Sequence, residues 1–249
     1  MNLLYGIHAA QRLIEQHPQR IAKAYVLAQA NERLTHLVSQ LGALDCPLER
    51  VTKERLHQLA SGQRHQGVCL EVASLPMQTE HAFLDQLEQE LTGFFLVLDG
   101  VSDPHNLGAC IRSAEAFGAN GLIIPKDNSA SLTPVARKVA CGAAELLPVY
   151  QVTNLVRAIK TMQDFNLWVY GTGWSEQSTN LFQTKFHNPC AVVMGSEGKG
   201  LRQLTAKNCD QLVTIYMPGI TESLNVSVAT GIMAAELVRQ GVYARPIAS

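Results

Sequence analysis

Apolar runs alternate with amphipathic segments along the last two thirds of the chain. Six short runs have the length and composition of buried strands, at 94–100, 119–125, 146–152, 167–173, 190–195 and 211–217. Apolar residues at helical spacing mark 107–118, 154–165 and 225–242, and Thr133-Pro134 is typical of a helix start. Strands that alternate with helices predict an α/β domain with a mainly parallel sheet covered on both faces.

The first 75 residues carry a second, shorter pattern. It predicts helices over 6–17, 32–41 and 53–60, the second of them capped by Asn31, and strands over 20–28, 47–51 and 67–73. We therefore expect a small N-terminal α/β domain over 1–75. Pro76 and the polar residues after it predict a linker with a lead-in helix over 76–92, and a second domain over 93–249.

Composition excludes several classes of protein. With 47% hydrophobic and 16% charged residues the chain has enough apolar material for a core, and we expect neither a membrane span nor a secretory signal. The six cysteines lie far apart and form no CxxC pair, so we expect reduced thiols in a cytoplasmic protein and no metal site. Net charge is −1. Residues 1–75 carry +2 and residues 76–249 carry −3, and this excess of positive charge in the first part is too small to indicate binding to nucleic acid.

Three segments at the ends of apolar runs are rich in Gly, Asn, Ser and charge. They read LDGVSDPHNLGACIRSAEAFGA (98–119), VVMGSEGKGL (192–201) and IYMPGITESLNVSVATG (215–231). Simple connections need only about 2–6 residues. Because ligands of open α/β sheets bind beyond the carboxyl ends of the strands, these segments predict a shared ligand site.

The first two segments hold three candidate side chains. Arg112 follows Asn106 by one and a half helical turns, and its guanidinium suits phosphate or ribose oxygens, although a surface arginine on an amphipathic helix explains it equally well. Glu197 is the only acid of the second segment and a candidate partner for Arg112; the alternative is a solvated carboxylate in a flexible turn. His105 is a candidate base, but a lone loop histidine is more often structural.

The third segment holds Ser223, Asn225 and Ser227 just before a helix. Each is a good N-cap, but all three cannot cap one helix end, so at least one is available for other work. Thr172 and Trp174 are candidates for an adenine pocket, with core packing the more common role of a tryptophan.

Familiar signatures of other enzymes are missing from the sequence. The segment GSEGKGL is not a phosphate-binding P-loop, because that motif ends in Gly-Lys-Ser/Thr, whereas here Gly200 and then Leu201 follow Gly198-Lys199. The GTG at 171–173 is too short for dinucleotide binding, and neither GxGxxG nor GxSxG occurs. These absences disfavour NAD-dependent and Ser-hydrolase chemistry.

The three segments, in this order and spacing, resemble the three motifs of the SpoU/TrmH class of SPOUT RNA 2'-O-methyltransferases. The N-terminal YGIHAAQRLI and RHQGVCLEV resemble the accessory domain of the 23S rRNA guanosine 2'-O-methyltransferases in that class, so the likeness covers nearly the whole chain. In one place the chain departs from the family pattern: the third motif usually reads Ile-Pro-Met, whereas here it reads Ile215-Tyr216-Met217, followed by Pro218.

The resemblance implies a C-terminal trefoil knot, an L30e-like RNA-binding N-terminal domain, and a homodimer through the knotted domain in which each chain completes the other's site. The cofactor would be S-adenosylmethionine and the partner 23S rRNA. It also implies two sets of site residues. The active-site positions would be Asn106, Arg112, Glu197, Ser223 and Asn225, and the cofactor-binding positions Gly173, Met194, Gly195, Ile215 and Leu224.

The implied reaction is 2'-O-methylation of a guanosine in the peptidyl-transferase region of 23S rRNA. We expect Arg112 to bind a phosphate and to stabilise a developing alkoxide, since a guanidinium holds its proton at neutral pH. Glu197 would orient Arg112. Three alternatives stay open: a tRNA guanosine 2'-O-methyltransferase, an rRNA adenosine methyltransferase that confers antibiotic resistance, and a ribosome-assembly factor without essential catalysis.

Overall fold

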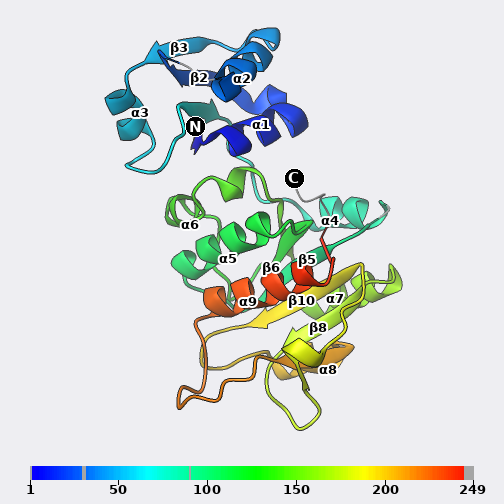
Figure 1. The fold of residues 1–249 in the computed structure, drawn as a ribbon. Helices are drawn as coiled ribbons and strands as arrows, with labels where there is room; N and C mark the ends of the chain where they lie inside the picture. Colours follow the sequence, from blue (N-terminus) through cyan, green and yellow to red (C-terminus); the bar gives the residue numbers. More distant parts are fainter. Residues whose placement is uncertain (1, 30–31, 90, 244–249) are drawn as a thin grey trace. The chain divides into compact units, whose positions relative to one another are not determined.

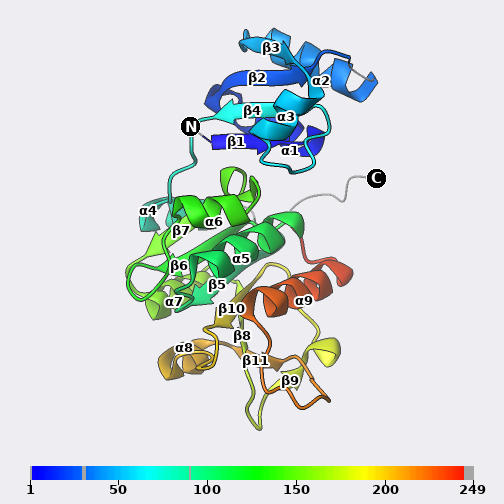
Figure 2. The ribbon, with the colours of Figure 1, turned by 90° about the vertical axis from the view of Figure 1, so that its left-hand side faces the viewer.

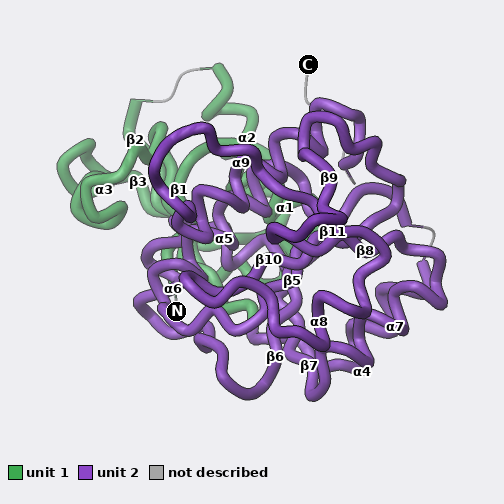
Figure 3. The backbone as a smooth tube through the Cα atoms, turned by 90° about the horizontal axis from the view of Figure 1, so that it is seen from below, with its two compact units in different colours: residues 1–75 green, residues 76–249 purple. Residues whose placement is uncertain are grey.

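The structure, a computed structural model, describes residues 2–29, 32–89 and 91–243 and divides into two compact units, 1–75 and 76–249 (Figure 3). Asn31, predicted as a helix cap, lies outside the described residues. Each unit has its own sheet and its own apolar core.

Unit 1 is a four-stranded mixed sheet in the order β1-β4-β2-β3. The pairings of β4 with β1 and with β2 are antiparallel, and that of β2 with β3 is parallel. The strands are β1 (Asn2–Tyr5), β2 (Ile21–Leu27), β3 (Leu48–Val51) and β4 (Val68–Val72), and the helices are α1 (Ile7–Gln16), α2 (Glu32–Ala43) and α3 (Lys53–Leu59), with a 3-10 turn η1 (Pro18–Arg20). The sequence pattern did not predict β1, which is only four residues long.

Unit 2 is a seven-stranded sheet in which every pairing is parallel, and this confirms the predicted fold class (Figures 1 and 2). The strand order is β7-β6-β5-β10-β8-β11-β9, so β10 lies between β5 and β8 while β11 lies outside β8. The strands are β5 (Phe94–Asp99), β6 (Gly121–Pro125), β7 (Val149–Val152), β8 (Trp168–Thr172), β9 (Thr179–Asn180), β10 (Cys190–Gly195) and β11 (Gln211–Thr214). The trefoil knot stays a prediction.

Helices cover both faces of this sheet, and each face has a separate apolar core. One core packs α5, α6 and α9 against the sheet, and the other packs α4 and α7 (Figure 2). The helices are α4 (Glu80–Leu87), α5 (Pro104–Ala116), α6 (Pro134–Val139), α7 (Leu155–Asp164), α8 (Gln203–Asn208) and α9 (Val226–Arg239), with 3-10 turns η2 (Ala143–Glu145) and η3 (Leu181–Gln183). Thr133 caps α6 as predicted, its hydroxyl accepting from the backbone N–H of Ala136.

Two of the boundaries that differ from the sequence prediction affect the polar loops. The strand expected over 211–217 ends at Thr214, because its neighbour β9 is only two residues long and the last pairing joins Thr214 to Asn180. Residues 215–217 therefore belong to the loop that leads to α9. Helix α5 begins at Pro104, three residues before the expected start, because the Asp103 side chain caps it by accepting from the His105 N–H.

No helix within 2–29, 32–89 and 91–243 has the length and apolar character that a membrane crossing requires.

Candidate active site

A pocket of about 530 Å³ lies beyond the carboxyl ends of β8, β10 and β11. Its walls come from 172–174, 194–201, 212–215, Met217 and 222–224, and the first turn of α9 contributes Val226 and Ala229. The second and third Gly- and Asn-rich segments therefore meet at one ligand-sized cavity, at the edge of the sheet where parallel α/β folds bind ligands.

All five residues that the resemblance assigns to the cofactor line this pocket, and they come from three different loops. They are Gly173 after β8, Met194 and Gly195 at the end of β10, and Ile215 and Leu224 in the loop between β11 and α9. Thr172 and Trp174 line it as well. The expectation of core packing for Trp174 is wrong, since 82% of its surface is exposed; it stands at the end of a strand where the chain leaves the core.

The loop after β10 is a tight glycine turn folded back onto Gly195. Backbone hydrogen bonds join Ser196 and Gly200 in both directions, at 3.1 and 3.0 Å. A Cβ atom on Gly195 would stand 2.2 Å from the carbonyl carbon of Gly200, so only glycine permits this approach. Gly200 has a φ of 65°, which also favours glycine. Gly195, Gly198 and Gly200 therefore leave the backbone of the turn bare of side chains at three positions of this wall of the pocket.

Asn225 connects the three loops through one side-chain amide. Its Nδ2 donates to Oδ1 of Asn106 at 2.9 Å and also to Oε1 of Glu197. Its Oδ1 accepts from the backbone N–H of Ser227 at 2.9 Å and thereby caps α9. The three residues, predicted from separate segments, thus form one hydrogen-bonded cluster. We name Asn106, Glu197 and Asn225 the amide cluster.

The Glu197 carboxylate also acts on the packed junction of α5 and α9. There the Cys110 Sγ lies 3.5 Å from the Thr230 hydroxyl. Burial, and after it the negative charge of Glu197, raises the pKa of the Cys110 thiol to about 11. Cys110 is therefore a neutral packing residue at physiological pH and not a nucleophile.

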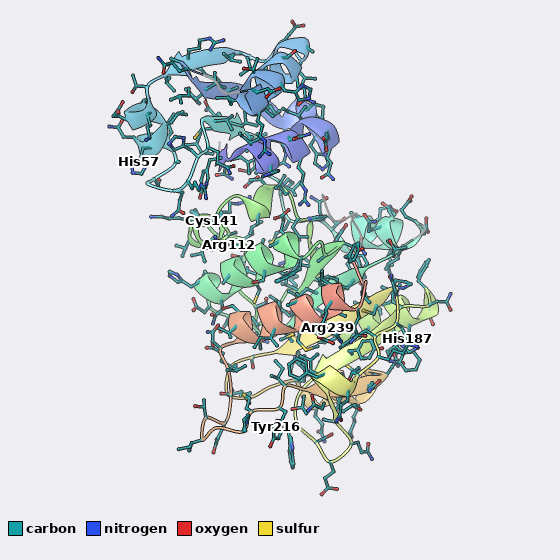
Figure 4. All side chains as sticks on the ribbon, in the orientation of Figure 1. His57, Arg112, Cys141, His187, Tyr216 and Arg239 are labelled. Atoms are coloured by element: carbon teal, nitrogen blue, oxygen red, sulfur yellow. The ribbon has the colours of Figure 1, made fainter. Side chains whose placement is uncertain are left out.

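Arg112 lies exposed on α5 and turns toward α6. Its Nη1 donates to the Sγ of Cys141, 3.4 Å away in the turn that follows α6 (Figure 4). The two helices approach closely because Gly108 has no side chain; a Cβ there would stand 2.4 Å from the carbonyl oxygen of Ala136. The expected contact between Arg112 and Glu197 is not formed among the described residues of this chain, since Glu197 is held by Asn225 instead.

The remaining candidates occupy exposed positions. Ser223 is exposed and lines the pocket, while Ser227 donates from its hydroxyl to Oδ1 of Asn225. His105 is exposed in the first turn of α5. Among the residues that the structure describes, no group of three or more His, Cys, Asp or Glu is arranged to hold a metal ion.

Sequence reasoning missed four charged residues of the site, one of which is Lys199 in the lining of the pocket. Glu222 lines the pocket, and Asp99 and Arg202 form an ion pair beside the glycine turn. A signal for Asp99 was available: it is the single charged residue in the otherwise apolar run FFLVLD. A charge in such a run is rarely buried unless it is paired.

Sequence comparison matches the chain to known families along nearly its whole length. A model of the SpoU rRNA Methylase family matches residues 93–235, and a model described as RNA 2'-O ribose methyltransferase substrate binding matches residues 3–78. The chain is 46% identical over 239 residues to the 23S rRNA (guanosine-2'-O-)-methyltransferase RlmB of Photorhabdus laumondii, covering 96% of this chain and 98% of the relative. It is 45% identical over 240 residues to the protein of the same name from Shewanella oneidensis, covering 96% and 97%.

Solved structures share the fold at lower identity. The AdoMet-bound SpoU methyltransferase AviRb of Streptomyces viridochromogenes superposes with a TM-score of 0.66 at 21% identity, covering 96% of this chain and 90% of that one. The AdoMet-bound rRNA methyltransferase of Sinorhizobium meliloti gives a TM-score of 0.65 at 22% identity, covering 96% and 87%.

Proposed function

The chain belongs to the SpoU rRNA methylase family, and on that premise we propose that it transfers a methyl group from S-adenosylmethionine to the 2'-oxygen of a guanosine in 23S rRNA. The relatives that carry this activity in their names are 46% and 45% identical over 96% of the chain. The observation that carries the proposal is the amide cluster, which ties the three motif loops together at the rim of a ligand-sized pocket.

The residues of the pocket fit S-adenosylmethionine. Gly173 and Gly198 have no heavy atom within 4 Å of where a Cβ would stand, so they leave room for a ligand, and Met194, Ile215 and Leu224 offer apolar surface for an adenosine. Glu197 and Glu222 outnumber Lys199 among the charged residues of the lining, and this excess of negative charge complements a cationic ligand. When bound, S-adenosylmethionine supplies a methyl group on a positively charged sulfur.

The protein's own contribution is alignment. Holding the 2'-oxygen in line with the methyl group can lower the barrier by ~7–11 kcal/mol. We assign Arg112 to a backbone phosphate and to the negative charge that develops on the 2'-oxygen, and Asn106, Ser223 and Asn225 to the ribose. Glu197 serves to hold Asn225 rather than to orient Arg112 of the same chain.

Unit 1 takes the role of RNA binding. Over residues 3–78 it matches the family model described as RNA 2'-O ribose methyltransferase substrate binding. Lys53, His57 and Arg64 are exposed on α3 and on the turn after it. The rings of His57 and His65 lie 6.4 Å apart, and burial, then the charges of His57 and Lys53, lower the pKa of His65. We name Lys53 and Arg64 the cationic corner, a surface suited to RNA phosphates.

We also assign a homodimer through unit 2, which would carry the knot, and a cytoplasmic location beside the ribosome. What supports the dimer is the placement of Arg112, which is exposed and bonded to Cys141 instead of Glu197. An arginine turned away from its own amide cluster is available to the site of a second copy. Each dimer would then contain two sites, both built from two chains.

The test is incubation of the purified protein with methyl-labelled S-adenosylmethionine and transcribed, unmodified 23S rRNA, followed by mapping of the label. One labelled guanosine ribose is the expected result, and a transcript with 2'-deoxyribose at that position accepts no methyl group. Parallel reactions with total tRNA examine the tRNA alternative. Label on a base, on an adenosine ribose or on tRNA alone would overturn the proposal.

A further inference from the structure

The carboxylate of Asp99 is fully buried at the carboxyl end of β5, and Arg202 occupies both of its oxygens. The backbone N–H of Arg202 donates to Oδ2 at 2.9 Å, and its Nε donates to Oδ1 at 2.5 Å. The Nη2 atom of Arg202 also lies 2.5 Å from Oδ1, while 51% of the arginine side chain stays exposed. A buried charge is thus neutralised by one residue that uses its backbone and its side chain together.

This ion pair fixes both ends of the glycine turn that lines the pocket. The turn leaves the sheet at Gly195, whose register partner in β5 is Asp99 itself. It returns at Arg202, the residue just before α8. Asp99 therefore lies beside Gly195, the first residue of the turn, and binds Arg202, the residue that follows the turn. The turn cannot open without breaking this ion pair.

The same carboxylate sits where the first motif loop begins. Gly100 follows Asp99, and a Cβ atom on Gly100 would meet the Cβ of Ser196 at 3.9 Å. The loop then runs to Asn106, a member of the amide cluster. Asp99 thus joins the loop that carries Asn106 to the turn that carries Glu197.

Stability alone does not account for this arrangement. Burying a carboxylate is costly, and a well-packed apolar pair in place of a buried ion pair is often as stable or more stable. An ion pair with directed hydrogen bonds does fix a geometry that an apolar contact leaves free. The ion pair lies between two motif loops, so the geometry that it fixes is the geometry of the site.

We infer that Asp99 and Arg202 are positioning residues, which hold the glycine turn 195–201 in the shape that receives S-adenosylmethionine. The inference rests on the proposed function for the identity of the ligand. Neither side chain lines the pocket; both act through the backbone of the turn.

The test compares Arg202→Gln with Arg202→Lys. Glutamine keeps the backbone bond to Asp99 but removes the charge and the fork of donors. Lysine keeps the charge with a single donor group. Arg239→Gln is the matched control, because Arg239 is also a mostly exposed arginine paired to a buried carboxylate, Glu236, on α9.

Calorimetry measures the affinity for S-adenosylmethionine. In the ligand-free protein, the rates of hydrogen exchange are measured at the backbone amides of Ser196 and Gly200. We expect Arg202→Gln to raise the Kd on the order of tenfold and to speed exchange at both amides, with Arg202→Lys intermediate. Arg239→Gln changes neither the Kd nor the exchange.

The outcomes separate the two proposals. A folded Arg202→Gln protein with wild-type Kd and wild-type exchange overturns the positioning role and leaves the proposed function intact. A wild-type protein that binds no S-adenosylmethionine overturns the proposed function, while the exchange rates still report whether the ion pair holds the turn.

Discussion

The side-chain amide of Asn225 donates to Oδ1 of Asn106 across 2.9 Å, although 119 residues separate the two in the sequence. The same amide caps α9 through its oxygen. The amide oxygen of Asn225 therefore has a structural role as a helix cap, and its nitrogen belongs to the site. A substitution that changes only the nitrogen separates the two roles.

Asn225→Asp is expected to keep the cap of α9 and to disrupt the amide cluster. An aspartate oxygen still accepts from Ser227 N–H, so thermal unfolding stays near wild type, but it cannot donate to Asn106 and it repels Glu197. We expect methyl transfer to fall about 100-fold, as misplaced reacting groups commonly cost. The control is Asn154→Asp at the cap of α7, which keeps full turnover. Comparable turnover in the two variants would refute a role for the amide cluster.

Arg112→Ala is expected to abolish methyl transfer while the affinity for S-adenosylmethionine stays unchanged. The guanidinium lies outside the pocket lining, and we assign it to the RNA. Methyl transfer to 23S rRNA and calorimetric titration of the cofactor measure the two properties. Lys160→Ala removes an exposed cation from α7 and serves as the control. Normal turnover by Arg112→Ala would remove this residue from the mechanism.

Mixing Arg112→Ala with Glu197→Ala is expected to restore activity that neither variant has alone. If a site takes Arg112 from one chain and Glu197 from the other, one of the two sites in each mixed dimer is intact. Co-refolding equal amounts then recovers up to about a quarter of wild-type turnover. The control is each variant co-refolded with itself, which stays inactive. No recovery in a verified mixed dimer would place both residues in a site made by a single chain.

Removing the cationic corner is expected to weaken RNA binding without touching the cofactor. In Lys53→Gln/Arg64→Gln the affinity for 23S rRNA falls. The slope of log affinity against log salt flattens by about 0.7 for each phosphate of single-stranded RNA that the protein no longer neutralises. The Kd for S-adenosylmethionine stays constant. Arg33→Gln changes an exposed cation on α2 as the control. An unchanged salt slope would mean that the RNA binds to a different surface of the protein.

Acid is expected to erase the contribution of Glu236 to stability. Its hydrogen bonds with Arg239, at 2.7 and 2.6 Å, hold the pKa of the carboxyl below its ordinary 4.5. A lowered folded pKa stabilises the protein above the unfolded value, and this stability is lost as the pH falls through the folded pKa. Glu236→Gln should lower the unfolding midpoint by about 2–4 °C at neutral pH.

The difference between Glu236→Gln and wild type should close as the pH falls below 4.5 and through the lowered pKa of Glu236. Calorimetric scans across that range measure it. Glu176→Gln makes the same change of charge at an exposed loop position and should leave the midpoint unaltered. A difference that stays constant with pH would mean that packing, and not charge, accounts for the effect of Glu236.

The order of residues along the chain was enough to predict the parallel α/β architecture and the edge of the sheet where a ligand binds. Apolar runs, helical spacing and caps such as Thr133 are each contained within a few neighbouring residues, so local physics suffices to interpret them. The three polar segments could be placed at the carboxyl ends of strands on the same grounds, and their resemblance to family motifs identified the chemistry.

Which of those residues meet depends on the folded chain. Strand order sets long-range contacts, and no local pattern contains it. The pairing partner of β11 ends the strand at Thr214, the close approach of α5 and α6 turns Arg112 toward Cys141, and the register of β5 with β10 brings Asp99 to the glycine turn. Each of these depends on where a distant segment lies, because hydrogen bonds and packing act between atoms in contact, whatever their separation in the chain.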